Sequence, residues 1–304
     1  MKAGARGDPR ETECERPTRH RGIATISIIC AGVFACSCGC RTPVFQHAQH
    51  ITQERRDSAY AKAEARFENA TLFKPRDELS APVGPELCPL IVEQQYCSAY
   101  DAPRHCGFGS VMVSPNGTPT IDSSFPAVYV NPCTVRLNAI EYSQLEYVWA
   151  RESHDAKSRI VWRGIRTTFD SEGFPLAWEI LDSGHELKLI FVSISLELAA
   201  VDRVGGPLPG RRFASETSIT MAPDFVVAGT VEDGPIPLGP YVYISARPSV
   251  ITALLCRCSP SGVDRFIDSR YYDVRPTEEL EVLGFELPPW PDTLGQGVRW
   301  PYEP

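Results

Sequence analysis

Alternating apolar and polar side chains give the clearest structural pattern in the chain. From Phe174 to Ile180 large apolar residues occupy every second position, which is typical of a strand with one buried face. Apolar runs at 160–169 and 187–192 flank this strand, and the turn sequences 170–173 and 182–185 separate the three runs. Turns this short join antiparallel neighbours, so the pattern predicts a three-stranded meander.

Further strands and two short helices are predicted after the meander. The apolar runs 224–231, 241–245 and 250–256 indicate strands. The segments 195–204 and 261–268 indicate short helices, because a serine suited to capping a helix N-terminus begins or precedes each of them. Helices that interrupt an antiparallel strand pattern predict an α+β fold, with a mainly antiparallel sheet and a few short helices.

The residues before this domain are predicted to form a tether. Residues 44–69 contain no glycine or proline and are rich in helix formers, so they predict an N-terminal spacer helix with a thin apolar stripe. A proline-rich linker completes the tether, which spans 40–85. Residues 86–285 then form a single α+β domain.

The C-terminal tail, 286–304, is rich in proline and tryptophan, which excludes one regular helix along it. It could pack across the domain through Trp290 and Trp300, or it could dock in a partner molecule. The burial of these two indole rings separates the alternatives.

Near the N-terminus, a basic stretch followed by an apolar one predicts an export signal. Arg16, Arg19 and Arg21 precede the segment 22–40, which has no charged residue and is rich in isoleucine, alanine and valine. Signal peptides have this order of a basic region and an apolar region.

Small residues stand directly before two cysteines at the end of this segment, Ala35 before Cys36 and Gly39 before Cys40. The arrangement resembles the lipobox of bacterial lipoproteins, in which a small residue precedes the cysteine that receives a diacylglycerol before the leader is cut. The resemblance implies a signal peptide at 1–39 and acylation of Cys40, with Cys36 as the alternative. It also implies an exported protein, anchored in a membrane of the bacterial cell envelope. An uncleaved signal anchor is the other interpretation, because about twenty apolar residues can span a bilayer.

Charge and cysteine content refine this picture. The formal net charge of −8 argues against a nucleic-acid partner, because phosphate binding requires lysine and arginine. Of the eleven cysteines, six follow the predicted leader and its acylated cysteine, and an even number of cysteines in an exported chain indicates disulfides. The cysteines expected to form them are Cys88, Cys97, Cys106, Cys133, Cys256 and Cys258.

The Cys256-Arg257-Cys258 sequence follows an apolar run that predicts a strand. Residues two apart on a strand face the same way, about 6.5 Å from each other, which disfavours a bond between them. We therefore expect Cys256 and Cys258 each to bond a cysteine in the 88–133 region. The alternative for this pair is a metal or redox site.

Candidate catalytic residues are few. The chain has no phosphate-binding loop, zinc helix, nucleophile elbow or haem-attachment motif. The acidic residues of the meander and its turns offer a weak enzyme hypothesis, in which two carboxylates hydrolyse a glycosidic bond. Its candidates are Glu179 and Glu186 with His185. The plainer interpretation is ordinary turn chemistry.

Aromatic and basic residues on the predicted strands offer a binding hypothesis. The aromatic candidates for a carbohydrate or peptide face are Trp149, Trp162, Trp178, Tyr271 and Tyr272. The alternative is that they form the core. Arg163 and Arg166 could hold a carboxylate or phosphate, or they could lie on a solvated strand face.

Taken together, the sequence favours a lipid-anchored envelope protein with a binding or structural role over an enzyme. Its expected partners are the membrane, through the lipid, and an envelope protein or polysaccharide. No cofactor and no metal are expected. A surface hydrolase using carboxylates in 170–186 and a metal or redox site at Cys256 and Cys258 are the alternatives.

Overall fold

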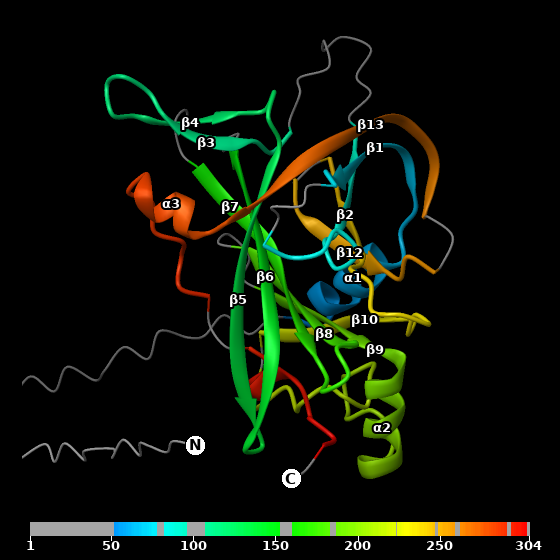
Figure 1. The fold of residues 1–304 in the computed structure, drawn as a ribbon. Coiled ribbons are helices and arrows are strands. Elements are labelled where there is room, and N and C mark those ends of the chain that lie inside the picture. The colour runs from blue at the N-terminus through cyan, green and yellow to red at the C-terminus, as the bar shows by residue number, and fades with distance from the viewer. Residues whose placement is uncertain are drawn as a thin grey trace, which may run out of the picture. The chain divides into compact units, whose positions relative to one another are not determined.

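A single mixed sheet of eleven strands organises the chain (Figure 1). The structure is a computed structural model, and the residues it describes are 52–77, 82–95, 107–152, 160–182, 187–222, 224–246, 249–258, 262–290 and 293–302. The strands follow the order β10-β9-β8-β7-β6-β5-β13-β1-β2-β11-β12 across the sheet. The two edge strands, β10 and β12, contact each other, so the sheet is nearly closed.

The sheet combines antiparallel and parallel pairs. Its strands are β1 (Phe67–Pro75), β2 (Leu90–Gln94), β5 (Ala127–Leu137), β6 (Ile140–Glu152), β7 (Ile160–Phe169), β8 (Pro175–Asp182), β9 (Lys188–Ser193), β10 (Phe225–Val231), β11 (Tyr241–Ile244), β12 (Ile251–Leu255) and β13 (Val263–Pro276). Pairing is parallel between β9 and β10, β5 and β13, β13 and β1, and β2 and β11. The expectation of a mainly antiparallel sheet is therefore only partly correct.

The remaining described elements are short. They are α1 (Gln53–Ala63), α2 (Ile194–Val204), α3 (Glu278–Val282), α4 (Leu294–Gly297) and a separate hairpin of β3 (Ser110–Val113) and β4 (Pro119–Asp122). The prediction of a strand-rich fold with a few short helices is confirmed at this level.

The meander is confirmed as β7, β8 and β9, which pair antiparallel in sequence order, although β8 is buried on both faces and not on one. In the turn after β7, the Asp170 carboxylate accepts hydrogen bonds from the backbone N–H groups of Glu172 and Phe174, at 2.9 and 2.8 Å. The helix after β9 is also confirmed, although its cap is Ser193, whose hydroxyl accepts from the Leu196 N–H. These elements can be predicted from sequence because the turn and capping contacts that determine them are made between residues close together in the chain.

One predicted helix is shorter than expected, and another is absent. Within 44–69 the structure has the helix α1 over Gln53–Ala63, while 44–51 lie outside the described residues and β1 begins at Phe67 between β13 and β2. The helix predicted over 261–268 is replaced by the first part of β13, which pairs with β1 in parallel. In both cases strand pairing and burial outweigh a local helical preference, because side chains such as Phe67 and Val263 pack between neighbouring strands.

One face of the sheet forms the interior. A single buried cluster draws side chains from all eleven strands, including Trp149, Trp178 and Tyr272, which requires that one face of the sheet curls inward. Two further clusters cover the outer face under α2, α3 and the tail. Trp300 packs against Tyr142 there, with ring centroids 5.2 Å apart, so the tail packs across the body.

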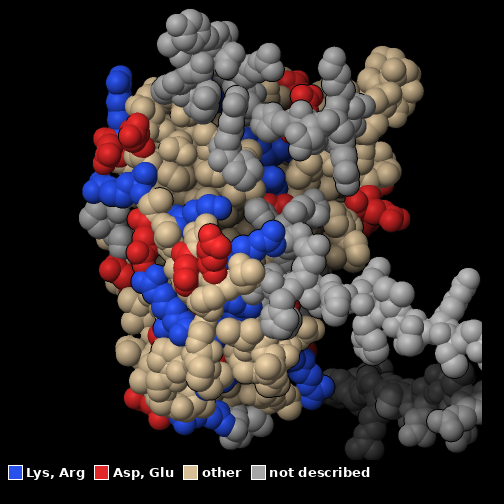
Figure 2. Space-filling model, turned by 180° about the vertical axis from the view of Figure 1, so that it is seen from behind, with Lys and Arg blue, Asp and Glu red and all other residues tan. Residues whose placement is uncertain are grey.

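Charged residues of both signs are interspersed on the face seen from behind (Figure 2). This mixture is typical of a solvated protein surface.

Candidate functional site

The sheet stays open between its two edge strands. β10 and β12 each have one hydrogen-bonded neighbour among the described strands, and α1 contacts both of them. We call this boundary the seam (Figure 1). Edge strands carry unpaired backbone groups, which must be bonded to something else or exposed to water.

Buried charged side chains bond the first part of the β10 edge. Arg56 of α1 donates from Nη1 to the Phe225 carbonyl oxygen at 2.9 Å, and Arg211 donates to the same oxygen. The Glu216 carboxylate accepts from the Val227 N–H at 3.0 Å. These side chains therefore replace the missing neighbouring strand.

Glu216 also orders the loop beside the seam. Its carboxylate accepts from the backbone N–H groups of Arg212 and Phe213, at 2.9 and 3.1 Å, and from the Tyr60 hydroxyl at 3.3 Å. We call Arg56, Tyr60, Arg211 and Glu216 the capping cluster. It ties α1, the loop and β10 together through groups that are almost entirely buried.

Burial shifts the pKa values of three members of the capping cluster. Loss of hydration raises the pKa of Glu216, against the backbone donors and Arg211, which lower it. Burial, followed by the neighbouring Glu216 carboxylate, raises the pKa of Tyr60 to about 12. Burial lowers the pKa of Arg56, and the adjacent Arg211 lowers it further.

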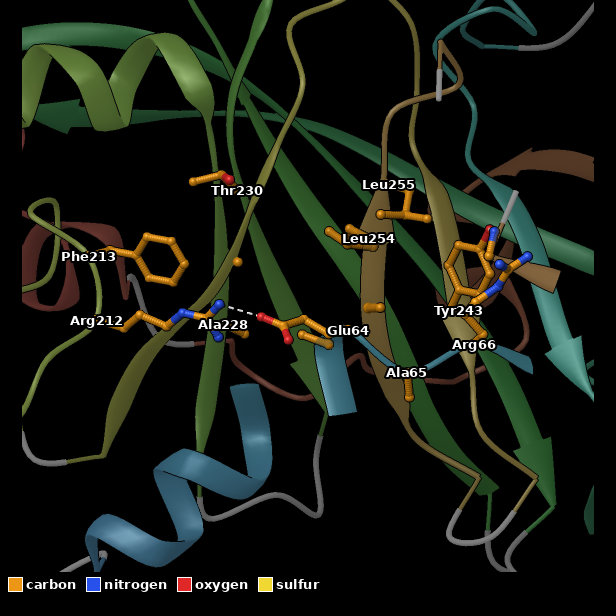
Figure 3. A pocket seen from close by; sticks show the side chains of 14 residues that line it. Glu64, Ala65, Arg66, Arg212, Phe213, Ala228, Thr230, Tyr243, Leu254 and Leu255 are labelled. Atoms are coloured by element: carbon orange, nitrogen blue, oxygen red, sulfur yellow. Dashed lines mark hydrogen bonds and ion pairs between the residues drawn. The ribbon is translucent and has the colours of Figure 1, made fainter. Parts of the chain in front are cut away.

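A pocket opens along β10 where this capping ends (Figure 3). It has a volume of about 520 Å³. Ala228 and Thr230 of β10 lie on one side and Leu254 and Leu255 of β12 on the other, with Glu64 between them. The Phe213 ring lies on the β10 side and faces that strand. The pocket therefore lies along the seam, and its walls are more apolar than polar, with charged groups contributed by Glu64, Arg66 and Arg212.

An exposed ion pair lies at this pocket. Arg212 bonds Glu64, which follows α1, and the two side chains are 45% and 61% exposed. The Arg212 guanidinium also lies 5.4 Å from the centre of the Tyr60 ring and 5.6 Å from that of Phe213. Stacking on these rings holds the cation in place while leaving it accessible.

Glu179, the one described catalytic candidate, lies away from the pocket. Its carboxylate is 3.4 Å from Arg166 and accepts from the Thr293 N–H at 3.1 Å. Arg166 bonds Glu146 as well, at 2.7 Å. Because the tail encloses this group, Arg166 is neither on a solvated face nor available to an external anion, and Glu179 is 2% exposed.

The predicted aromatic face is not formed. Trp149, Trp162, Trp178 and Tyr272 are buried in the core, and only Tyr271 of this set is exposed, at 55%. The Arg163 side chain also points inward, where its Nε lies 3.6 Å from Oδ2 of Asp182. Strand aromatics at alternate positions thus fill the interior and the covered outer face.

The cysteine pairing differs from the prediction. Cys256 bonds Cys258, with Cα atoms 5.1 Å apart, so the predicted bridges to the 88–133 region are wrong. The prediction assumed an extended chain through Cys258, whereas β12 ends at Leu255 and the chain turns there. Cys88 and Cys133 are free thiols, and burial raises their pKa values to about 12 and about 11.

The remaining candidates lie outside the described residues. They are Cys36, Cys40, Cys97, Cys106, His185 and Glu186. Within the described part of the chain, no cluster of histidine, cysteine and acidic side chains has the arrangement of a metal site.

Comparison with known proteins gives no relative. No protein-family model matches the chain, and neither a curated protein nor a solved structure matches it. Among the residues that the structure describes, no helix has both the length and the apolar character needed to cross a bilayer.

The sequence did not identify the capping cluster. Arg56 and Glu216 are 160 positions apart, and nothing near either of them indicates that they meet. The only local signal is the Arg211-Arg212 pair shortly before Glu216, which is common on solvated loops.

Proposed function

We propose that this protein binds a small amphiphilic ligand in the seam pocket, and that a lipid on Cys40 anchors it in the cell envelope. The observation that supports binding is the pocket between β10 and β12, whose lining is more apolar than polar and includes the accessible Arg212. Ligand sites are typically apolar concavities with a few placed polar groups.

The chemistry of the pocket favours an apolar body with one anionic group. Phe213, Leu254 and Leu255 offer contacts to the apolar part. Arg212 offers a cation to the anion, which would replace Glu64 as its partner. An exposed ion pair contributes only about 0–1 kcal/mol, so this exchange costs little.

Binding can be tested with 8-anilinonaphthalene-1-sulfonate, which joins an aromatic body to a sulfonate. The fluorescence of the dye should rise saturably with the full chain. Gly262→Phe should weaken binding about tenfold, or ~1.4 kcal/mol, by filling the pocket. A Cβ at Gly262 would lie 3.6 Å from Leu255 Cδ1, an ordinary contact, so the fold should tolerate the change.

Gly206→Phe is the matched control. Gly206 is exposed outside the pocket, and a Cβ there would have no neighbour within 4 Å. Equal dye affinity in the two variants would place the dye elsewhere and refute the proposal. Arg212→Gln should weaken the dye severalfold at low salt and less at high salt, because salt screens the exposed cation.

Anchoring has a separate test. The mass of the protein extracted from membranes should match residues 40–304 with acyl chains. Cys40→Ser should abolish acylation, and Cys36→Ser should leave it unchanged. A full-length mass without acyl groups would contradict the anchor.

A further inference from the structure

The Cys256–Cys258 bridge has one sulfur inside the protein and one at its surface. Cys256 is buried and belongs to the interior cluster, where β12 ends. Cys258 is exposed after the turn. An exposed sulfur is open to attack by a thiolate, and access is a main determinant of exchange rate.

The bridge adds little to the fold. Its two cysteines are separated by two positions, so it closes a very small loop. In the chain-entropy model the stabilisation by a disulfide grows with the loop that it closes. A structural brace is therefore a weak explanation for this pair.

A backbone donor is already in place for the buried sulfur. The Cys258 N–H points at Cys256 Sγ, with nitrogen and sulfur 3.1 Å apart. Burial disfavours a thiolate at Cys256, and the same N–H offsets part of this cost, since hydrogen bonds to an ionised group are stronger than those to a neutral one. A stabilised leaving thiolate speeds the cleavage of the bridge.

We propose that Cys256 and Cys258 form a redox-active pair that transfers its disulfide to a partner dithiol, in addition to the ligand binding proposed above. One partner thiolate attacks Cys258 Sγ, which forms a mixed disulfide and breaks the bond to Cys256. Cys256 leaves with the electron pair as a thiolate. The second partner thiolate then attacks the partner sulfur that is bonded to Cys258. This forms the partner's disulfide and releases Cys258 as a thiolate.

The exchange balances without a further reagent. The partner dithiol is oxidised to a disulfide, and Cys256 and Cys258 are reduced to two thiols, which take up the two protons that the partner loses. The attacking group is an anion, and the Glu232 carboxylate is 3.7 Å from Cys258 Sγ. Glu232 should therefore slow the approach of a thiolate.

The first experiment compares bridge reduction by dithiothreitol in the folded chain and in guanidinium. Reduction is followed by alkylation and peptide mass measurement. Because Cys258 is exposed, the folded rate should lie within about threefold of the denatured rate. A folded rate more than about a hundredfold slower would show an inaccessible bridge and overturn the proposal.

Charge gives a sharper test. Glu232→Gln should speed reduction about two- to fivefold at low salt, because it removes the negative charge beside the attacked sulfur. Glu281→Gln on α3 changes the net charge equally and should leave the rate unchanged. Equal rates in both variants and the wild type would contradict attack at Cys258.

Transfer itself is tested with a reduced synthetic peptide that contains two cysteines. One peptide should be oxidised per oxidised protein, and Cys133→Ser should retain this activity. Cys256→Ser should instead trap glutathione as a stable mixed disulfide on Cys258 when oxidised glutathione is added. A folded Cys256→Ser protein that takes up no glutathione, or a peptide that stays reduced while the bridge persists, would overturn the proposal.

Discussion

Two arginine–glutamate groups in this protein have the same chemistry and opposite settings. Arg166 lies between Glu146 and Glu179 on the central strands β6, β7 and β8, where all three side chains are largely buried. Arg212 pairs with Glu64 beside the seam, where both side chains are largely exposed. The residue types are identical, so burial decides which group supports the fold and which remains free to exchange its partner.

The sheet explains the difference. β7 is bonded on both sides, and the tail covers the outer face at Arg166, whose Nη2 is 3.5 Å from the Trp290 carbonyl oxygen. At the seam, β10 has a bonded neighbour on one side only among the strands that the structure describes. A charged pair that the protein encloses needs protein hydrogen-bond partners for all its polar atoms, whereas water can solvate a pair at the seam.

The largest expected effect is at the buried group. Arg166→Ala should lower the free energy of unfolding by about 3–5 kcal/mol, because it leaves buried carboxylates without their cation. Urea denaturation measures this. Glu172→Ala, in the exposed turn after β7, should change the stability by no more than about 0.5 kcal/mol. Similar effects of the two substitutions would mean that Arg166 is solvated.

An intermediate effect is expected at the capping cluster. Tyr60→Phe removes a hydroxyl that bonds Glu216 and should cost about 1 kcal/mol at neutral pH. The pKa of Tyr60 is raised from 10.0 to about 12, so between these values the folded state keeps a proton that the unfolded state has lost. The free energy of unfolding must therefore fall as the pH rises from about 10 towards 12.

Tyr60→Phe should make that alkaline fall shallower, because phenylalanine has no proton to lose. Urea denaturation at several pH values from 8 to about 11.5 gives the two slopes. Burial also raises the pKa values of Tyr147 and Tyr272, so a residual fall remains in the variant. Identical slopes would show that Tyr60 titrates as a solvated phenol.

The smallest effect on stability is expected at the exposed pair. Arg212→Ala should change the free energy of unfolding by less than about 1 kcal/mol, because an exposed ion pair is hydrated and screened by salt. A loss near that of Arg166→Ala would assign Arg212 to the fold and not to the pocket. Thermal or urea denaturation on both variants decides this comparison directly.

The predictable part of the fold depends on local contacts. The meander follows from alternation between 174 and 180, and its first turn from Asp170, whose carboxylate bonds its own turn. The helix α2 follows from a capping serine and from Gly205, which has a positive φ of 80°. Each of these signals acts within a few residues, so no distant segment can alter it.

Prediction failed where distant segments meet. Residues 67–75 and 263–276 form adjacent parallel strands, although nearly two hundred positions separate them. Nothing in either segment indicates this partner, and so a helix was predicted in part of each. The same reason hides the capping cluster, whose members come from α1 and from the loop before β10.

The sequence by itself determined the strand-rich character of the chain, the meander and the helix that follows it, because alternation, turns and caps act locally. Only the tertiary structure decided that Glu179 is enclosed, that Cys256 bonds Cys258 and that a pocket opens along the seam. The physical reason is that burial depends on what covers a residue. Glu179 is covered by Thr293, which lies 114 positions later in the chain, in the C-terminal tail. The Thr293 N–H donates a hydrogen bond to the Glu179 carboxylate.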